Sequence, residues 1–322
     1  MYFNNNNNFF HGIMFHHFHD KDIHTKGQGS ISKDEFYKII NFIGKKNILD
    51  ADIFFEKFKS KKLKNNEVCL TFDDAIKSQV DIALPVLEEL KIKSFFFVYS
   101  SIFEGIPDNL ETFRYFRMNY FNNINNFYTE FYKFIEKDLN IFFERNISKL
   151  ESAKMKFPHY SIEDIKFRLV RDNFLNKKEY EDLMFLIMKE KKFNYKKFYT
   201  KLAFNENDLK KLDNLGHLIG LHSHSHPTLL EKLNYEDQKE EYKRNLSVIS
   251  KILNKSEKDI KYMSHPCGSY NKNTLDILIE LEIELGFKQL MTIELEKGME
   301  KINNSSLEIA RQDHSKIIKL IK

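Results

Sequence analysis

Two polar motifs each follow a short apolar run, and this repeated arrangement constrains the fold more than any other feature of the sequence. Thr71-Phe72-Asp73-Asp74 follows the run at 67–70, and the stretch His222–Pro227 follows the run at 217–221. A short apolar run bounded by polar residues is typical of a buried strand. Parallel strands of a barrel present their carboxyl ends at one rim. We therefore expect both polar motifs to lie together at that rim.

Strand and helix signals alternate along most of the chain, which favours parallel strands covered by helices. Ser32 and Glu35 form a capping box that opens a helix reaching about Lys45. Strands are expected at 13–15 and 94–98, and other strands should end at His222, Ser264, Thr292 and Arg311. Further helices are expected at 50–61, 76–91, 207–215, 235–254 and 273–286.

The stretch 105–200 breaks this alternation. No glycine occurs between Gly105 and Gly216, so the tight turns seen elsewhere are missing, and large apolar residues recur at helical spacing in 126–143 and 180–193. We interpret 105–200 as a helical insertion within one domain that spans 1–322. Its aromatic stripes are expected to form its own core. A lid or a homo-oligomer contact is the alternative, because long insertions near an active rim are often functional.

The residue types in the two motifs are those of a catalytic metal site. Imidazole nitrogens and a carboxylate oxygen ligate zinc-type ions that keep one position open for water. His222 and His226, at i and i+4, can converge on one ion, and the doublet Asp73-Asp74 offers one carboxylate to the metal and one to a proton. By spacing alone, His224 is an alternative ligand. Each motif by itself fits a polar turn better than a site, but the two together favour the site.

Composition argues against several classes of protein. Charged residues make up 30% of the chain and the formal net charge is +4, with Lys and Glu interspersed, which argues against nucleic-acid binding. No apolar stretch approaches the length needed to cross a bilayer. The two cysteines, Cys69 and Cys267, make no disulfide framework, and the start of the chain lacks a signal-peptide hydrophobic region. These features predict a soluble cytoplasmic protein.

The motifs resemble those of the NodB-homology polysaccharide deacetylases, carbohydrate esterase family four. The first family motif, Thr-Phe-Asp-Asp, is unchanged at 71–74, and His-Ser/Thr-x-x-His followed by Pro matches 222–227. The third, Arg-x-Pro followed by an aromatic residue and Gly, is matched in part: the core Pro266-Cys267-Gly268 is kept, but Ser264 stands at the arginine position. The resemblance covers about 11–104 and 200–314.

This resemblance implies a distorted, incomplete (β/α) barrel of about seven parallel strands, carrying the large helical insertion. It makes Asp73 the general base and His224 a bystander or a support for the ligands. Pro266 and the backbone N–H of Cys267 would contact the substrate and its oxyanion. The ligands of one divalent ion, zinc by ligand type, would be Asp74, His222 and His226.

Two family features are missing and need substitutes. The family arginine helps to orient the catalytic Asp; with Ser264 in its place, this task falls to His265 or Arg311. The family's Asp/Trp motif cannot exist as such, because the chain has no Trp. Met291 or Leu307 would then line the pocket for the acetyl methyl group.

The last family motif, Leu-x-His, is replaced by Ala310-Arg311-Gln312-Asp313-His314, after an expected final strand at Leu307–Ala310. Arg311, Asp313 and His314 would close the active rim. Arg311 would face the substrate, and His314 would be the general acid that protonates the leaving amine. A surface histidine is the alternative for His314.

Two further clusters have open interpretations. His16 and His17 lie in a histidine-rich loop after the first expected strand, at the rim where they would contact substrate; a second metal site and ordinary polar loop residues are the alternatives. Arg168 and Arg171, one helical turn apart in the insertion, could bind a phosphate or form surface ion pairs.

Together these interpretations predict a cytoplasmic, metal-dependent hydrolase that removes N-acetyl groups from an amino sugar. A cytoplasmic relative would act on a sugar still being assembled, which favours an intermediate of bacterial surface-glycan (lipopolysaccharide or capsule) biosynthesis. The expected partner is the acetylated amino sugar, with no nucleic acid and no stable membrane insertion. The alternatives are an amidohydrolase for a non-sugar amide and a catalytically silent sugar-binding protein of the same fold.

Overall fold

The computed structural model describes residues 2–3, 11–27, 29–106, 109–135, 138–156, 160–289 and 305–321. The chain forms two compact units, one made of residues 1–107 with 201–322 and the other of residues 108–200. The seven strands of the described residues all belong to the first unit, and the second unit is helical.

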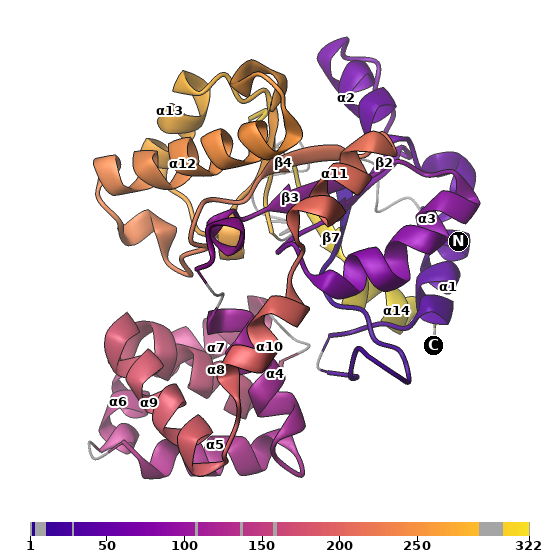
Figure 1. Ribbon diagram of the computed structural model, residues 1–322. Coiled ribbons are helices and arrows are strands. Elements are labelled where there is room, and N and C mark those ends of the chain that lie inside the picture. Colours follow the sequence, from indigo (N-terminus) through magenta and orange to yellow (C-terminus); the bar gives the residue numbers. More distant parts are fainter. Residues whose placement is uncertain are drawn as a thin grey trace. The chain divides into compact units, whose positions relative to one another are not determined.

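The first unit is built on a parallel sheet of seven strands that curls into a nearly closed barrel. Figure 1 labels β2, β3, β4 and β7 of this sheet. The strand order is β6-β5-β4-β3-β2-β1-β7, and every pairing is parallel. Phe287 of β6 pairs with Ile309, just before β7, so one segment touches both edges of the sheet. The predicted distorted barrel is thereby confirmed. The strands are β1 His11–Phe15, β2 Val68–Phe72, β3 Phe95–Val98, β4 Leu218–Leu221, β5 Tyr262–Ser264, β6 Leu285–Phe287 and β7 Arg311–Asp313.

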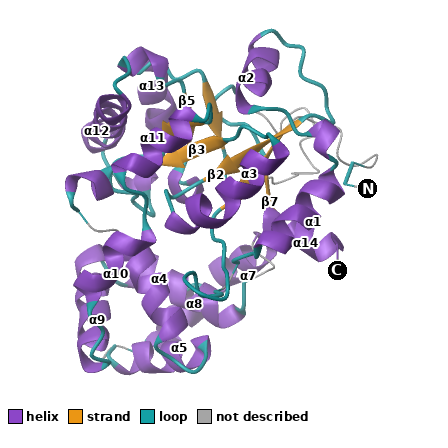
Figure 2. Cartoon of the chain, turned by 45° about the vertical axis from the view of Figure 1, so that its right-hand side comes forward, coloured by secondary structure: helices purple, strands orange, loops and turns teal. Residues whose placement is uncertain are grey.

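Helices surround the strands, as Figure 2 shows, and the strand residues are buried on both faces of the sheet. Strands buried on both faces need near-continuous apolar sequence, which is why the run at 95–98 is Phe-Phe-Phe-Val. The predicted capping box opens α1: Ser32 Oγ accepts from the Glu35 N–H, and Glu35 accepts from the Ser32 N–H. The helices are α1 Lys33–Ile43, α2 Ala51–Lys59, α3 Leu84–Leu90, α11 Glu206–Asn214, α12 Tyr235–Leu253, α13 Lys272–Glu280 and α14 His314–Ile321.

One predicted helix is too long. The helix expected at 273–286 ends at Glu280, because Glu282 adopts a left-handed φ of 59° and the chain then enters β6. Gly286 had suggested a helix end, but it lies within the strand. A Cβ there would lie 2.7 Å from the carbonyl oxygen of Leu307, so only glycine allows that close approach. The strand expected to end at Thr292 lies outside the described residues.

The final strand lies a few residues later than predicted. We expected it at Leu307–Ala310 with Arg311 emerging at the rim, but β7 begins at Arg311 and pairs with β1. The Arg311 side chain therefore points into the barrel instead of out of its mouth. Gly12 of β1 leaves the space for it, since a Cβ there would lie 3.3 Å from Arg311 Cγ.

The second unit has its own aromatic core, which includes Phe113, Phe127, Phe131 and Phe167 with Met184. None of the described helices combines the length and the apolarity that crossing a bilayer requires. The helices of this stretch, the last of which runs two residues into the first unit, are α4 Asn109–Asn119, α5 Ile124–Lys133, α6 Leu139–Arg145, α7 Ile147–Lys156, α8 Ile162–Leu169, α9 Lys177–Glu190 and α10 Tyr195–Leu202.

Candidate active site

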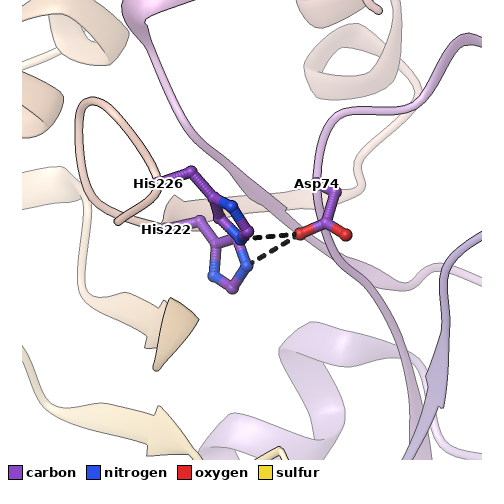
Figure 3. Close-up of side chains that lie close together, drawn as sticks. All are labelled: Asp74, His222 and His226. Atoms are coloured by element: carbon purple, nitrogen blue, oxygen red, sulfur yellow. Dashed lines mark hydrogen bonds and ion pairs between the residues drawn. The ribbon is translucent and has the colours of Figure 1, made fainter. Parts of the chain in front are cut away.

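Asp74, His222 and His226 converge where β2 and β4 end (Figure 3). The Nε2 atoms of His222 and His226 lie 3.0 and 3.1 Å from Oδ1 of Asp74. All three ligand atoms lie within 4.8 Å of one another. The group could hold one metal ion, as the spacing of the two motifs predicted.

The donor set fits a tetrahedral divalent ion. Zinc ligands at roughly 2.0–2.1 Å from the ion lie about 3.3 Å apart along an edge of the tetrahedron, close to the 3.0 and 3.1 Å found here. His222 Nδ1 lies 2.8 Å from the carbonyl oxygen of Ser264. A carbonyl only accepts, so this contact assigns the proton to Nδ1 and leaves the Nε2 lone pair for a metal.

Backbone strain gathers at the same place. Among the described non-glycine residues, ten have positive φ, and five of these lie in the three motif segments or directly after one of them. Such conformations cost on the order of 1–3 kcal/mol each and persist only where the surroundings hold them, typically at functional sites. The five are Asp74 at 75°, Ala75 at 49°, Ser223 at 61°, His226 at 53° and Cys267 at 52°.

A buried asparagine on α12 fixes the start of the loop that carries His222 and His226. Asn245 Oδ1 accepts from the His222 N–H at 3.0 Å, and Asn245 Nδ2 donates to the Val98 carbonyl at 3.0 Å. It therefore joins the ends of β3 and β4. No motif predicted this residue, although an asparagine on the apolar face between Tyr242 and Leu246 was an available signal.

Asp73 is held by a guanidinium inside the barrel. Its Oδ1 accepts from Arg311 Nη1 at 2.7 Å and its Oδ2 from Nη2 at 2.6 Å. Ser264 Oγ donates to Oδ2 at 3.1 Å and accepts from Arg311 Nη2 at 2.8 Å. Burial by itself raises the pKa of Asp73, but Arg311 and His222 outweigh it, so the pKa is lowered.

Arg311 uses all five of its N–H donors within the barrel, since Nε also donates to the Lys288 carbonyl at 2.6 Å and Nη1 to Thr71 Oγ1 at 3.2 Å. The side chain is 0% exposed. The prediction that Arg311 contacts substrate is therefore corrected: it has neither surface nor a spare donor for that contact. Of the two residues considered as substitutes for the family arginine, Arg311 is the one that reaches Asp73. His265 instead contacts the Leu307 carbonyl, and burial lowers its pKa to about 3.

His314 is also placed differently from its predicted role. Its Nδ1 and Nε2 lie 3.1 and 2.9 Å from the carbonyl oxygens of Met14 and Gly29, and its ring stacks on Phe15. With both nitrogens against backbone carbonyls, His314 is not positioned to protonate a leaving amine. The physical reason is that α14 starts at this residue, so the side chain turns with the helix.

His16 is the loop histidine that borders the site. Its Nε2 lies 3.8 Å from Asp74 Oδ2 and 4.0 Å from Asp73 Oδ2, and its side chain is 19% exposed. His17 stacks against it. Gln79, unnoticed in the sequence, donates to the carbonyls of His16 and Asp73 at 2.9 and 2.6 Å and so joins the two loops. No sequence pattern marked it.

The remaining candidates lie in several parts of the fold. Among the described residues, the group of Asp74 is the only cluster with metal-ligand geometry, and His19 and His24 instead contact Ser30 and Asp81. Pro266 is buried and Cys267 is partly exposed in the turn η7 Pro266–Gly268. Leu307 belongs to the barrel core, and Met291 lies outside the described residues.

In the helical unit, Arg168 contacts Asp164 at 3.1 Å and Arg171 contacts Asp172 at 2.7 Å. This arrangement matches the ion-pair alternative for the two arginines and not the phosphate clamp.

Comparisons with known proteins agree with the barrel fold. Residues 172–286 match the model of the polysaccharide deacetylase family. The Streptococcus pyogenes deacetylase PplD in complex with acetate has 14% identity and a TM-score of 0.55, with 97% of each chain covered. IcaB from Ammonifex degensii has 12% identity and a TM-score of 0.55, covering 98% of this chain and 97% of that one.

A de-N-acetylase from Aggregatibacter actinomycetemcomitans has 12% identity and a TM-score of 0.54, covering 97% of this chain and 99% of that one. At these identities the likeness shows the fold. The comparison with curated proteins found no match.

Proposed function

We propose that this chain, which belongs to the polysaccharide deacetylase family, is a metal-dependent hydrolase that removes N-acetyl groups from an amino sugar. The observation that carries the proposal is the contrast between two adjacent carboxylates. Asp74 faces two imidazoles, whereas Asp73 faces a guanidinium and a hydroxyl. Neighbouring acids with such different surroundings are suited to different tasks.

Asp74, His222 and His226 would hold the ion, with zinc expected for two imidazoles and one carboxylate. When bound, the ion supplies Lewis acidity to the amide carbonyl and to the attacking water. The residues themselves contribute a fixed geometry, because the Ser264 carbonyl and Asn245 hold His222 in one orientation.

Asp73 would accept the proton of the attacking water. The bidentate contact with Arg311 keeps the carboxylate ionised and fixes its plane. Each carboxylate oxygen can accept two hydrogen bonds, and Oδ1 accepts one from Arg311, so it retains capacity for the water. Arg311 thereby orients the base from β7, whereas the family arginine would do so from the position of Ser264.

The substrate class rests on the relatives. The structure of the Streptococcus pyogenes deacetylase contains acetate, the product that an N-acetyl hydrolase releases, and the Aggregatibacter protein is a de-N-acetylase. We propose an N-acetylated amino sugar on the way to a bacterial surface glycan, processed in the cytoplasm. His16 and His17 are the loop residues that we expect to contact it.

Acetate release from a panel of substrates tests the proposal. The panel contains free N-acetylglucosamine, its oligomers, a nucleotide-linked N-acetylamino sugar and simple N-acetylated amines. We expect release from at least one sugar by the metal-loaded protein and none by His222→Ala. Release from the simple amides alone would favour the non-sugar amidohydrolase. Sugar binding without acetate release from any substrate would favour the catalytically silent sugar-binding protein.

A further inference from the structure

We propose that the two segments joining the barrel to the helical unit position the metal ligands, so that metal affinity depends on them. The inference rests on the metal site proposed above. One segment, at 100–105, leads into residues 108–200 and contacts the loop of His222 and His226. The other, at 203–208, follows that unit and contacts the turn of Asp74.

His224 makes the contacts between the loop of the metal ligands and the first segment, at 100–105. We call these contacts the first connection. Its carbonyl oxygen accepts from the N–H groups of Ser100 and Ser101 at 3.2 and 2.9 Å. Its Nδ1 lies 2.9 Å from Ser100 Oγ, and its Nε2 lies 3.4 Å from Glu104 in the turn η3 Ser101–Glu104. Both ring nitrogens are thus directed to the segment that leads into the helical unit. We therefore assign His224 as a positioning residue and not as a third imidazole ligand.

The other side of the same loop is fixed by α12. Glu241 Oε2 accepts from the N–H groups of His224 and Ser225 at 2.9 and 2.7 Å. Arg244, one turn further along, contacts Glu104 at 2.8 Å. The loop is held between α12 and η3, and Glu104 of η3 contacts both His224 of the loop and Arg244 of α12.

The second connection consists of the contacts between the segment at 203–208 and residues 75–77. It supports the strained turn that contains Asp74 and Ala75. The Phe204 N–H donates to the Ala75 carbonyl at 2.8 Å, and Ala203 forms an antiparallel bridge with Ile76. Lys77 Nζ lies 2.7 and 2.8 Å from the two oxygens of Asp208. Asp74 and Ala75 have φ of 75° and 49°, a pair of conformations that needs such support.

The consequence follows from where the ligands originate. Oδ1 of Asp74 comes from one loop and both Nε2 atoms come from the other, and each loop is bonded to a segment next to the insertion. If a loop loses its contacts with the segment at 100–105 or at 203–208, the loop relaxes and its ligand atom moves. Residues that support metal ligands typically contribute about 10–100-fold to metal affinity.

The test measures the Zn²⁺ dissociation constant of the full-length protein by competition with a chromophoric chelator. The variants are Ser100→Ala and His224→Ala for the first connection and Lys77→Met for the second. Lys57→Met is the matched control: it also removes a lysine from a carboxylate, Glu67, at the opposite end of β2. The two pairs are similarly buried, with side chains 33% and 10% exposed for Lys57 and Glu67 against 25% and 11% for Lys77 and Asp208.

We expect a dissociation constant about 10–100-fold higher for His224→Ala and Lys77→Met, a smaller rise for Ser100→Ala, and no change for Lys57→Met. The absorption spectrum of bound Co²⁺ should change in the first two variants, because it reports the ligand geometry. If His224→Ala does not fold, Ser100→Ala, which removes a single hydroxyl, decides for that connection.

Unchanged metal affinity in Ser100→Ala, His224→Ala and Lys77→Met, with loss in His222→Ala, would overturn the coupling and leave the proposed site intact. Loss of metal in His224→Ala as complete as in His222→Ala would make His224 a ligand and also overturn it. Unchanged affinity in His222→Ala would instead disprove the metal site itself.

Discussion

The barrel and the helical unit each bury an aspartate beside an arginine, but they do so in different ways. Asp73 in the barrel and Asp164 in the helical unit are both 1% exposed. Asp164 contacts Arg168 four residues along the same helix, and Tyr128 donates to it at 2.8 Å. Asp73 contacts Arg311, which lies 238 residues away in sequence.

The difference shows which pair the local fold explains. An i,i+4 pair on a helix needs only the helix to form, and it supports that helix. A bidentate pair across a barrel must be assembled from two distant strands, and burying it gains little stability over apolar residues. Asp73 and Arg311 therefore call for a functional explanation, whereas Asp164 and Arg168 are explained by the packing of their own unit.

The largest expected effect separates the two aspartates by activity. Asp73→Asn should retain its metal and its fold yet lose about 10²–10⁴-fold in turnover, because an amide cannot accept the proton. Acetate release measured alongside metal content checks this expectation. Near-normal turnover of metal-loaded Asp73→Asn would reassign the base and remove the contrast with Asp164.

Arg311→Lys tests the same comparison by changing the cation that contacts Asp73. Lysine keeps the charge but cannot make the bidentate contact, so we expect kcat to fall about 10²-fold with KM nearly unchanged, as for a misplaced catalytic group. The double variant Ser264→Arg with Arg311→Ser moves the guanidinium to the family position and should recover part of the kcat lost in Arg311→Ser. An unchanged kcat of the folded Arg311→Lys protein, or no recovery in the double variant, would speak for a purely structural arginine.

Asp164→Asn should affect stability and not chemistry. Losing a charged acceptor from Tyr128 and Arg168 should cost about 1.5–3 kcal/mol in the free energy of unfolding, with unchanged kcat for the folded protein. Burial raises the pKa of Asp164, but Arg168 and Tyr128 lower it further, so its folded pKa lies below the ordinary value. This contribution is therefore present above the unfolded pKa and is lost as pH falls through the folded one. Urea unfolding of both proteins at neutral and acidic pH measures it.

The smallest effect is expected at the surface of the helical unit. Lys178 and Asp182 form an exposed i,i+4 pair, and such pairs contribute little because solvent screens them. Lys178→Ala should leave both the thermal midpoint and kcat unchanged. A clear loss of stability would show that the ion pairs of this unit act as a network, and it would weaken the distinction drawn for Asp164.

The sequence predicted the parts that depend on local pattern. Apolar runs followed by polar residues placed the strand ends, and the position of both motifs at strand ends anticipated the meeting of His222 and His226 with Asp74. Features set by strand register were not predictable. The position of Arg311 depends on β7 starting three residues before its helix, and no local signal gives that.

The errors have the same origin. His314 was expected at the rim because a strand end was placed too early, and Gly286 was interpreted as a helix end although it allows a close approach between β6 and Leu307. The bonds of His224 to the segment that leads into the helical unit come from a contact between distant loops. The site roles of Asp73 and of the three ligands stay predictions.

The most direct test of the proposed chemistry is a zinc titration of metal-free protein, following acetate release from an N-acetylated amino sugar. We predict no release without metal and a linear rise that stops at one equivalent. Asp73→Asn should bind the same equivalent and release no more than a small fraction of the acetate. Release by the metal-free protein, or none from the fully loaded protein on any sugar of the panel, would contradict a metal-dependent amino-sugar deacetylase.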